Sequence, residues 1–376
     1  MFQMLIFFSF LISGLAYSAD FPVPSPPQVG ASSYIILDAS SGKVIIESNS
    51  TERVEPASIT KLMTAYVVFN ELRSGQISLE DEVLISEKAW RTEGSRMFIE
   101  VDTYVSVINL LKGMIIQSGN DASVALAEYV GGSEEIFADL MNQYASILGM
   151  SDSQFRNSTG LPADNHYVST KDVAILSQAL IREFPEYYSW YSEREFAFND
   201  INQYNRNLLL WRDDSVDGLK TGYTEKAGYC LVSSAKRSDM RLISVVMGMD
   251  SAESRAEASQ SLLNFGFRFY ETHKLYSRDE EVVLARVWGG EPKEVQLGVD
   301  QDVFITVPRG SYDSLSAFMN YNQELQAPIE KDLIVGEVNI SLDGNDLVTF
   351  PLKTLFPVYE ATIWERIKDQ FYLWTN

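Results

Sequence analysis

The sequence predicts an α/β (α+β) domain with helices flanking an antiparallel sheet, then a small all-β sandwich-like domain and a C-terminal amphipathic helix. Residues 33–272 mix helical and strand patterns, whereas residues 273–357 hold β-rich runs separated by Gly, Pro and Asp turns. Residues 361–376 repeat apolar side chains at helical spacing. The chain has 376 residues, and a domain commonly holds about 100–200, so two domains are expected.

The N-terminus has the pattern of a signal peptide over residues 1–19. Met4 to Leu15 is apolar, and Ala16-Tyr-Ser-Ala19 offers small residues for cleavage. No Lys or Arg precedes Lys43, so the usual basic segment is missing, and a short uncleaved anchor is the alternative. We expect a cleaved peptide, a stiff Pro-containing linker over residues 20–32, and therefore an exported protein.

Composition excludes several classes of function. The formal net charge of −22 disfavours nucleic acid as a partner, because like charges repel. His166 and His273 are the only histidines, which disfavours a Ser-His-Asp triad or a multi-histidine zinc site, and we expect no metal and no cofactor. Cys230 is the single cysteine, so it forms no intrachain disulfide and reads as a small buried hydrophobe.

Periodicity and turn residues divide residues 33–272 into strands and helices. Strands are expected at 33–47 (two, joined at 40–43), 229–235 and 240–248. Helices are expected at about 57–72, 107–117, 121–130, 170–181 and 253–264. The fourth of these helices opens with Ser169-Thr-Lys-Asp172, which has the capping-box pattern.

The C-terminal helix is predicted to have two unlike faces. Its apolar face carries Trp364, Ile367, Phe371 and Trp374. Its other face carries Glu365, Arg366, Lys368 and Asp369. Because tryptophan rings settle at membrane interfaces, we expect this helix to associate with a membrane surface. The alternative is a terminal helix that packs on its own protein.

Ser-x-x-Lys occurs three times, as Ser40…Lys43, Ser58…Lys61 and Ser233…Lys236. The first match lies in a turn, and the third straddles the end of a strand. Only Ser58-Ile-Thr-Lys61 opens a helix, where a spacing of three residues puts both side chains on one face.

This placement predicts a nucleophile and its base. A serine hydroxyl attacks poorly until a neighbouring base removes its proton. Lysine serves as that base when burial and a second ammonium lower its pKa. A helix N-terminus also offers N–H groups to an oxyanion. Ser58 is therefore predicted to be the nucleophile and Lys61 the base.

Two further motifs follow along the chain. Ser118-Gly-Asn120 interrupts two helices, so it is expected to be a loop that presents a hydroxyl and an amide. Lys220-Thr-Gly222 is predicted to begin a strand whose edge accepts an extended substrate and whose lysine holds a carboxylate. Singly, Ser118 could be a helix cap and Lys220 a surface charge. The ordered set is much more specific than any of its members.

With these motifs, the sequence resembles the penicillin-binding proteins, and most closely the low-molecular-mass D-alanyl-D-alanine carboxypeptidases of peptidase family S11. The resemblance covers nearly the whole chain. It includes Pro56-Ala-Ser-Ile-Thr-Lys-Leu-Met-Thr, Gly94-Ser-Arg-Met-Phe, Ser118-Gly-Asn-Asp-Ala, Asn157-Ser-Thr-Gly-Leu, Asp217-Gly-Leu-Lys-Thr-Gly-Tyr-Thr, Arg241-Leu-Ile-Ser-Val-Val-Met-Gly and Phe265-Gly-Phe-Arg-Phe-Tyr-Glu-Thr.

The resemblance implies removal of the terminal D-alanine from peptidoglycan pentapeptide stems through an acyl-enzyme at Ser58, which penicillin also acylates. Lys61 would be the base, and Ser118 and Asn120 would relay protons and position the substrate. It also implies a penicillin-binding/serine β-lactamase-like transpeptidase fold, with a part in cell-wall maturation and cell shape.

The remaining site residues also come from the resemblance. Lys220 would hold the substrate carboxylate, with Thr221 and Gly222 on the same edge. The N–H groups of Ser58 and Tyr223 would form the oxyanion hole. Two further residues match arginines near the carboxylate end of the site in relatives, namely Arg206 and Arg255.

Similarity further implies a periplasmic enzyme attached peripherally to the outer face of the inner membrane, with β-lactam antibiotics as ligands. Relatives often carry a more basic terminal helix than Glu365-Arg-Ile-Lys-Asp. Three alternatives stay open: a D,D-endopeptidase, a serine β-lactamase and a non-catalytic penicillin-binding scaffold. Ser-Gly-Asn in place of Ser-Asp-Asn and the long β-domain argue against the β-lactamase.

Overall fold

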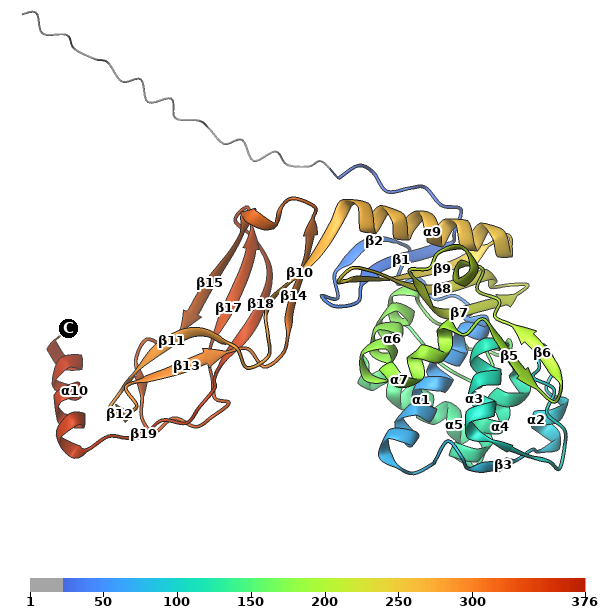
Figure 1. The fold of residues 1–376 in the computed structure, drawn as a ribbon, viewed down its shortest axis with the longest axis horizontal. Coiled ribbons are helices and arrows are strands. Elements are labelled where there is room, and N and C mark those ends of the chain that lie inside the picture. The colour runs from blue at the N-terminus through green and yellow to red at the C-terminus, as the bar shows by residue number, and fades with distance from the viewer. Residues whose placement is uncertain (1–22, 376) are drawn as a thin grey trace, which may run out of the picture.

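Two domains and a terminal helix follow one another in the computed structural model, which describes residues 23–375 (Figure 1). The N-terminal domain runs from β1 to α9, and the β-domain runs from β10 to β19. The predicted signal peptide, 1–19, lies outside the described residues. Among the described helices, none has both the length and the apolarity needed to span a membrane.

The N-terminal domain is built on a five-stranded antiparallel sheet in the order β2-β1-β9-β8-β7. Its strands are β1 (Ser33–Asp38), β2 (Val44–Ser48), β7 (Val216–Thr224), β8 (Gly228–Arg237) and β9 (Met240–Met249). Alternation along β1 sends Ile35 and Leu37 into one core and Tyr34 and Ile36 into the other. Both faces of the sheet are therefore covered, and β7 is an edge strand.

Helices cover the two faces unequally. The long helix α9 (Ala252–Phe269) packs against one face, on the side of the smaller core, and the short helix α8 (Leu209–Arg212) adds Leu209 and Leu210 to the same core. The other helices gather on the opposite side (Figure 1). They are α1 (Lys61–Ser74), α2 (Glu87–Arg91), α3 (Val107–Ile116), α4 (Asn120–Gly131), α5 (Glu134–Ile147), α6 (Thr170–Glu183) and α7 (Pro185–Tyr188). Short hairpins complete the domain: β3 (Glu82–Leu84) with β4 (Tyr104–Ser106), and β5 (Glu195–Phe198) with β6 (Ile201–Tyr204).

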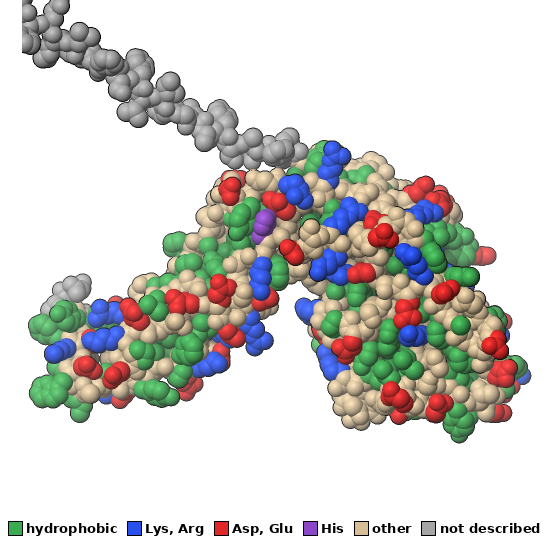
Figure 2. All heavy atoms as spheres, in the orientation of Figure 1, with side chains coloured by type: hydrophobic (Ala, Val, Ile, Leu, Met, Phe, Trp, Pro, Cys, Tyr) green, Lys and Arg blue, Asp and Glu red, His purple; other side chains and the backbone are tan. Residues whose placement is uncertain are grey.

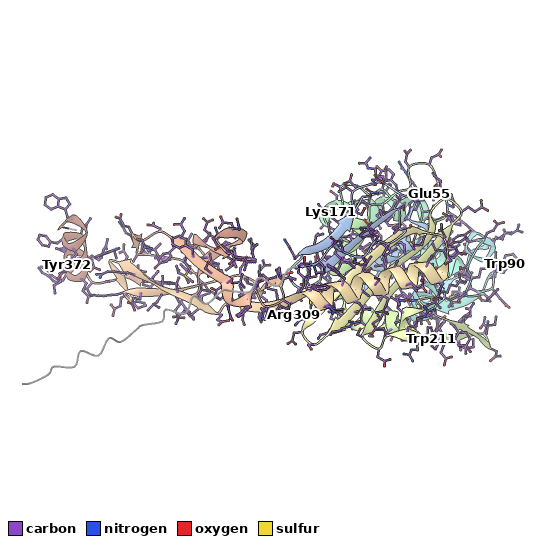
Figure 3. All side chains as sticks on the ribbon, turned by 90° about the horizontal axis from the view of Figure 1, so that it is seen from above. Glu55, Trp90, Lys171, Trp211, Arg309 and Tyr372 are labelled. Carbon is purple, nitrogen blue, oxygen red and sulfur yellow. The ribbon has the colours of Figure 1, made fainter. Side chains whose placement is uncertain are left out.

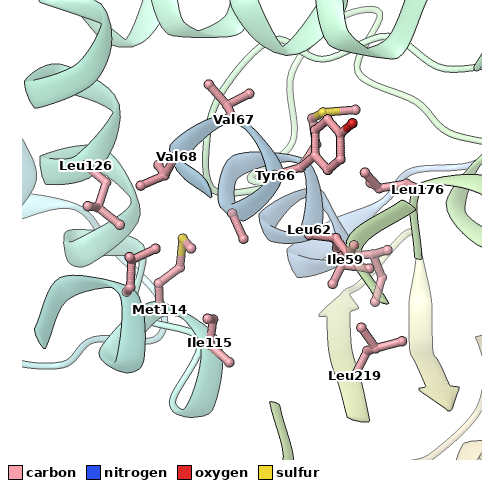
Figure 4. Close-up of a cluster of buried hydrophobic side chains, with 14 of the residues drawn as sticks. Ile59, Leu62, Tyr66, Val67, Val68, Met114, Ile115, Leu126, Leu176 and Leu219 are labelled. Atoms are coloured by element: carbon pink, nitrogen blue, oxygen red, sulfur yellow. The ribbon is translucent and has the colours of Figure 1, made fainter. Parts of the chain in front are cut away.

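Helix α1 lies inside this larger core. Each residue from Lys61 to Asn70 is buried, as expected of a helix that is surrounded by other elements. Figure 4 shows Leu62 and Val68 of α1 among side chains from the neighbouring helices and from β7. Because α1 is held on all sides, its N-terminus is a fixed point.

The helix caps follow the sequence closely. The Ser169 hydroxyl accepts a hydrogen bond from the Asp172 N–H at 3.1 Å, so the predicted start of α6 is confirmed. Ser251 and Ser254 form a capping box at the start of α9. That helix continues to Phe269, beyond its predicted end at Asn264, because its later residues still pack into the core beside the sheet.

The β-domain contains a six-stranded sheet in the order β15-β17-β18-β13-β11-β16. Its strands are β10 (Tyr270–Tyr276), β11 (Glu281–Trp288), β12 (Gly290–Glu291), β13 (Glu294–Gly298), β14 (Val303–Pro308), β15 (Leu315–Tyr321), β16 (Leu325–Gln326), β17 (Ile334–Leu342), β18 (Asn345–Thr354) and β19 (Tyr359–Glu360). Asp343 and Gly344, with φ of 50° and 79°, form the predicted hairpin turn between β17 and β18.

The two domains meet where α9 passes directly into β10. The buried Asp38 carboxylate, at the end of β1, accepts a hydrogen bond from the Thr272 hydroxyl at 2.8 Å. The Ser41 and Thr306 hydroxyls lie 2.6 Å apart. These contacts join the β10–β14 ribbon to the turn that follows β1.

Helix α10 (Ile363–Thr375) packs on the β-domain through its polar side. The Asp369 carboxylate is buried and accepts a hydrogen bond from the Gly289 N–H at 2.9 Å. Trp364 and Trp374 are 78% and 89% exposed, and Figure 2 shows hydrophobic side chains gathered at this end of the molecule. The helix thus contacts its own protein, as the alternative interpretation required, but with its charged face and not its apolar one.

Candidate active site

Ser58 lies in a short 3₁₀ turn, Ala57–Thr60, that leads into α1. The sequence predicted one continuous helix here. In a 3₁₀ turn, residues three apart align, so the tighter geometry brings Ser58 and Lys61 together more directly. The Lys61 Nζ donates a hydrogen bond to Ser58 Oγ at 2.9 Å.

The other two Ser-x-x-Lys matches make no such pair. Ser40 and Lys43 lie in the turn between β1 and β2. In β8, Ser233 is buried whereas Lys236 is exposed, because residues three apart in a strand point to opposite faces.

Lys61 is 1% exposed, and acceptors surround its amine. Besides Ser58 Oγ, the Nζ donates to Asn120 Oδ1 at 2.7 Å and to the Thr159 carbonyl at 2.6 Å. Burial, and secondly the charge of Arg206, lower the Lys61 pKa to about 7, although Asp121 opposes this shift. A lysine with this pKa is partly neutral near neutral pH, which a general base requires.

Ser118 has a second lysine as its partner. It lies between α3 and α4 with a φ of 69°, and its Oγ accepts a hydrogen bond from Lys220 Nζ at 2.8 Å. Burial, followed by the charges of Lys61, Arg206 and Arg255, holds the Lys220 pKa well below its usual value.

The position of Lys220 differs from the prediction in one respect. Lys220-Thr-Gly222 lies in the second half of β7 and does not begin it, because the strand already starts at Val216, inside Asp213-Asp-Ser-Val-Asp-Gly218, whose composition is typical of a turn. Lys220 is 3% exposed and lies behind the wall of the cleft, whereas Ser118 and Thr221 line it. Its amine therefore reaches the cleft through the Ser118 hydroxyl.

Asn120 begins α4 and links two segments around Lys61. Its side-chain Nδ2 donates to the Glu93 carbonyl at 2.6 Å, and its backbone N–H donates to the Ser95 carbonyl at 2.7 Å. The next residue, Asp121, accepts hydrogen bonds from the N–H groups of Met97 and Phe98. The loop that carries Gly94 and Ser95 is thereby fixed along one wall of the cleft.

Sequence reasoning gave no role to Thr159, although its carbonyl contacts Lys61. The Asn157 side chain accepts hydrogen bonds from the N–H groups of Thr159 and Gly160, at 3.2 and 2.7 Å, and so shapes this loop. The signal was present in Asn157-Ser-Thr-Gly-Leu, a motif of the family resemblance. This motif alone does not indicate a chemical role for Thr159, because the group that contacts Lys61 is a main-chain carbonyl and not a side chain.

Two glycines allow the main chain to approach the nucleophile closely. A Cβ on Gly160, whose φ is 85°, would overlap the Ala57 carbonyl. A Cβ on Gly222 would lie 3.2 Å from the Ser58 nitrogen. Strand β7 therefore runs beside the Ser58 N–H, where the family resemblance implies an oxyanion hole shared with the Tyr223 N–H.

One cleft of about 720 Å³ is lined by Ser58, Ser118, Asn120, Thr159, Gly160 and Gly222. The Arg206 guanidinium donates to Ser95 Oγ at 2.8 Å, and Arg255 donates to the Gly222 and Cys230 carbonyls at 3.0 and 3.2 Å. No Asp or Glu side chain is among the described residues that line it. Although the chain carries a net charge of −22, this cleft therefore favours an anionic ligand.

The histidines lie away from the nucleophile. His166 Nε2 is 3.0 Å from Thr60 Oγ1, and burial lowers the His166 pKa to about 4. His273 belongs to the β-domain, where its ring stacks on Tyr312. Serine, lysine and a helix-flanked antiparallel sheet together define a serine hydrolase of the penicillin-binding-protein fold.

Comparison with known proteins agrees with this class. The family model described as D-alanyl-D-alanine carboxypeptidase matches residues 21–251, and the model for the C-terminal domain of penicillin-binding protein 5 matches residues 270–360. The D-alanyl-D-alanine carboxypeptidase DacA of Escherichia coli K12 is 43% identical over 92% of this chain and 88% of its own. The chain therefore belongs to the D-alanyl-D-alanine carboxypeptidase family.

Solved structures show the same likeness. Penicillin-binding protein 5 of Haemophilus influenzae covers 90% of this chain and 100% of its own, with 42% identity and a TM-score of 0.86. Penicillin-binding protein D2 of Listeria monocytogenes, in an ampicillin-bound form, covers 65% of this chain and 100% of its own, with 29% identity and a TM-score of 0.60. The predicted fold and the predicted enzyme class are confirmed.

Proposed function

We propose that this D-alanyl-D-alanine carboxypeptidase works through an acyl-enzyme at Ser58. The observation that carries the proposal is the buried Lys61 amine 2.9 Å from Ser58 Oγ. Neutral Lys61 takes the hydroxyl proton while Oγ bonds to the carbonyl carbon between the two D-alanines. The N–H groups of Ser58 and Tyr223 then stabilise the oxyanion.

The leaving group needs a proton on its nitrogen. The proton that Lys61 took from Ser58 is relayed to that nitrogen as the C–N bond breaks, through the hydroxyl of Ser118, which lines the cleft and is hydrogen-bonded to Lys220. Lys61 is thereby neutral again and Ser118 keeps its hydroxyl. Arg206 and Arg255, at the cationic end of the cleft, hold the carboxylate of this D-alanine until it departs as the free amino acid. Neutral Lys61 then takes a proton from a water molecule as the water oxygen attacks the Ser58 ester, and it returns this proton to Ser58 Oγ as the shortened stem leaves.

The same cleft explains how a β-lactam would bind. A penicillin presents a carboxylate beside a strained amide, so it matches both the arginines and the nucleophile. The ampicillin-bound relative supports this assignment. We expect benzylpenicillin to acylate Ser58 and to stay attached for minutes or longer, whereas turnover at several molecules per second would favour the β-lactamase alternative.

The direct test is release of D-alanine from a pentapeptide that ends in D-Ala-D-Ala. The parent enzyme should release it, and Ser58→Ala should abolish that release because, among the described residues, the hydroxyl that contacts the Lys61 amine is that of Ser58. If neither protein releases D-alanine, the result would favour a penicillin-binding scaffold. Cleavage of cross-linked dimers in preference to the pentapeptide would favour the endopeptidase.

We further propose an exported, periplasmic enzyme that attaches to the outer face of the inner membrane through α10. Support comes from the signal-like residues 1–19 and from the exposed Ile363, Trp364, Ile367 and Phe371. Deleting residues 361–376 should move the protein from the membrane fraction to the soluble one and leave D-alanine release intact. An unchanged distribution would refute the attachment.

A further inference from the structure

The path of a bound stem peptide follows from the edge strand β7. An extended peptide pairs antiparallel with such an edge. With its carboxylate near Arg206 and Ser118, the peptide lies beside Lys220 at its C-terminal end and beside Thr224 further back. The residues that precede the scissile bond therefore leave the cleft past Thr224 and Leu161, which line this exit.

A second groove, of about 620 Å³, begins at that exit. Leu161 lines the cleft, and the next residue, Pro162, lines the groove. On the other side, Thr224 lines the cleft, and Lys226 in the following turn lines the groove. Glu55 lines the groove and contacts Thr224 of the cleft, and Figure 3 labels it at the margin of the N-terminal domain.

The groove presents charges of both signs side by side. The Glu55 carboxylate lies 2.8 Å from Lys226 Nζ, and its other oxygen accepts a hydrogen bond from the Thr224 hydroxyl at 3.4 Å. The Lys226 side chain is 80% exposed, and an ion pair with such an exposed partner contributes little to stability. A ligand with a positive and a negative group can therefore replace the Glu55–Lys226 ion pair at a small cost in free energy.

The floor of the groove is fixed to the turn that carries the nucleophile. His166 is 4% exposed and lines the groove, and its Nε2 contacts Thr60 Oγ1, two residues after Ser58. Its Nδ1 is buried and has no hydrogen-bond partner among the described residues. Because His166 contacts Thr60, the floor of the groove and the turn of Ser58 are parts of one packed unit.

We propose that this groove is a subsite for the side chain of the stem residue two positions before the released D-alanine, and that it selects a side chain ending in an amine and a carboxylate on one carbon. The amine binds Glu55, and the carboxylate binds Lys226. This inference rests on the proposed function, because it takes the direction of the substrate from it.

A neighbouring groove also begins at Thr159 and Leu161, and is lined by Lys88, Arg91 and Glu134. No described residue of β7 or of the turn after it lines this second candidate. It lies off the line of the edge strand. For this reason it provides the matched control.

The experiment compares two peptides on each protein sample. They are Nα-acetyl-X-D-Ala-D-Ala, with X either meso-diaminopimelate or Nε-acetyl-lysine, so that only the end of the side chain differs. We expect the parent enzyme to favour the first peptide about tenfold in kcat/KM for D-alanine release. Glu55→Gln and Lys226→Met should each bring this ratio below about threefold, and Lys88→Met should keep it.

A ratio measured on one sample is independent of how much of a variant is folded. Equal cleavage of both peptides by the parent enzyme overturns the subsite but leaves the proposed function standing. Release of D-alanine from neither peptide overturns the proposed function itself. A ratio that persists in both groove variants, or that is lost only in Lys88→Met, also overturns the assignment.

Discussion

The cleft and helix α10 depart from the usual pattern of burial in opposite directions. In the cleft, Lys61 and Lys220 are 1% and 3% exposed, whereas on α10 two tryptophans are more than three-quarters exposed. Lysine is rarely fully buried, and large apolar surfaces are rarely left open. Each departure lowers stability locally, and each one lies where we propose that the protein meets something else: a reacting bond in one case and a surface in the other.

The two regions also differ in how firmly they are held. The Lys61 amine donates hydrogen bonds to three segments of the chain. Gly160 and Gly222 pack closely against the Ser58 turn. On α10, by contrast, Asp369 is the buried charged contact. Changes in the cleft should therefore act steeply on the reaction, and changes in α10 should act gradually on location and stability.

The largest effect is expected from Lys61→Met. Loss of the base should slow acylation of Ser58 by a fluorescent penicillin roughly 10³-fold or more. Rapid mixing with the labelled penicillin measures this rate. Lys236→Met, which removes the exposed lysine of another Ser-x-x-Lys match, is the control and should acylate normally. If Lys61→Met were acylated at nearly the parental rate, Lys61 could not be the base.

The next effect is a dependence on pH. With a Lys61 pKa of about 7, the neutral base predominates above that pH and is lost as the pH falls through it. We expect kcat/KM for D-alanine release to fall about tenfold for each pH unit below this pKa. A profile measured in buffers of constant ionic strength checks this. A flat profile between pH 5 and about 8 would contradict the assignment.

A smaller effect is expected on α10. Replacing Trp364 and Trp374 together by serine should weaken binding to phospholipid vesicles about tenfold, because both rings are exposed on the apolar face. Co-sedimentation with vesicles measures the affinity. The matched control is a double substitution of the exposed Trp90 and Trp211 of the N-terminal domain, which should leave vesicle binding unchanged. Equal losses in the two pairs would show a nonspecific effect.

The smallest effect is expected from Asp369→Ala. Removal of a buried hydrogen-bonded carboxylate should destabilise the packing of α10 by about 1–3 kcal/mol, and the rest of the β-domain should remain folded. Hydrogen exchange at the Gly289 amide, which donates to Asp369, reports this loosening. Lys368→Ala, at an exposed neighbouring position, should leave the exchange rate unchanged. If the exchange rate of the Gly289 amide were unchanged in Asp369→Ala, contacts other than Asp369 would hold α10 on the β-domain.

The sequence predicted the elements whose signals are local. The cap at Ser169 and the Asp343-Gly344 turn follow from neighbouring residues, and so do the helices α1, α3, α4, α6 and α9, whereas α5 (Glu134–Ile147) was not predicted. The start of β7 was missed because Asp213 to Gly218 is rich in turn-forming residues, and pairing with β8 overrides that preference from Val216 onward.

The site was predictable as a set of side chains but not as an arrangement. Ser58, Lys61, Ser118 and Lys220 were named from motifs, and the structure brings them together. The Thr159 carbonyl and the placement of Lys220 behind Ser118 depend on how distant segments pack, which no local pattern encodes. The sequence also did not predict which face of α10 packs on the β-domain, because this depends on the contact of the buried Asp369 carboxylate with the distant Gly289 N–H.

The two glycines beside the nucleophile also constrain how this enzyme could evolve. Every mutation at Gly160 adds a Cβ that collides with the Ala57 carbonyl, and one at Gly222 crowds the Ser58 nitrogen. Substitution of Gly160 should therefore disrupt the site, and substitution of Gly222 should require the Ser58 turn to shift. Heritable changes in drug preference should accumulate at Leu161, Leu208 and Tyr223, where the walls of the cleft are side chains that can be exchanged.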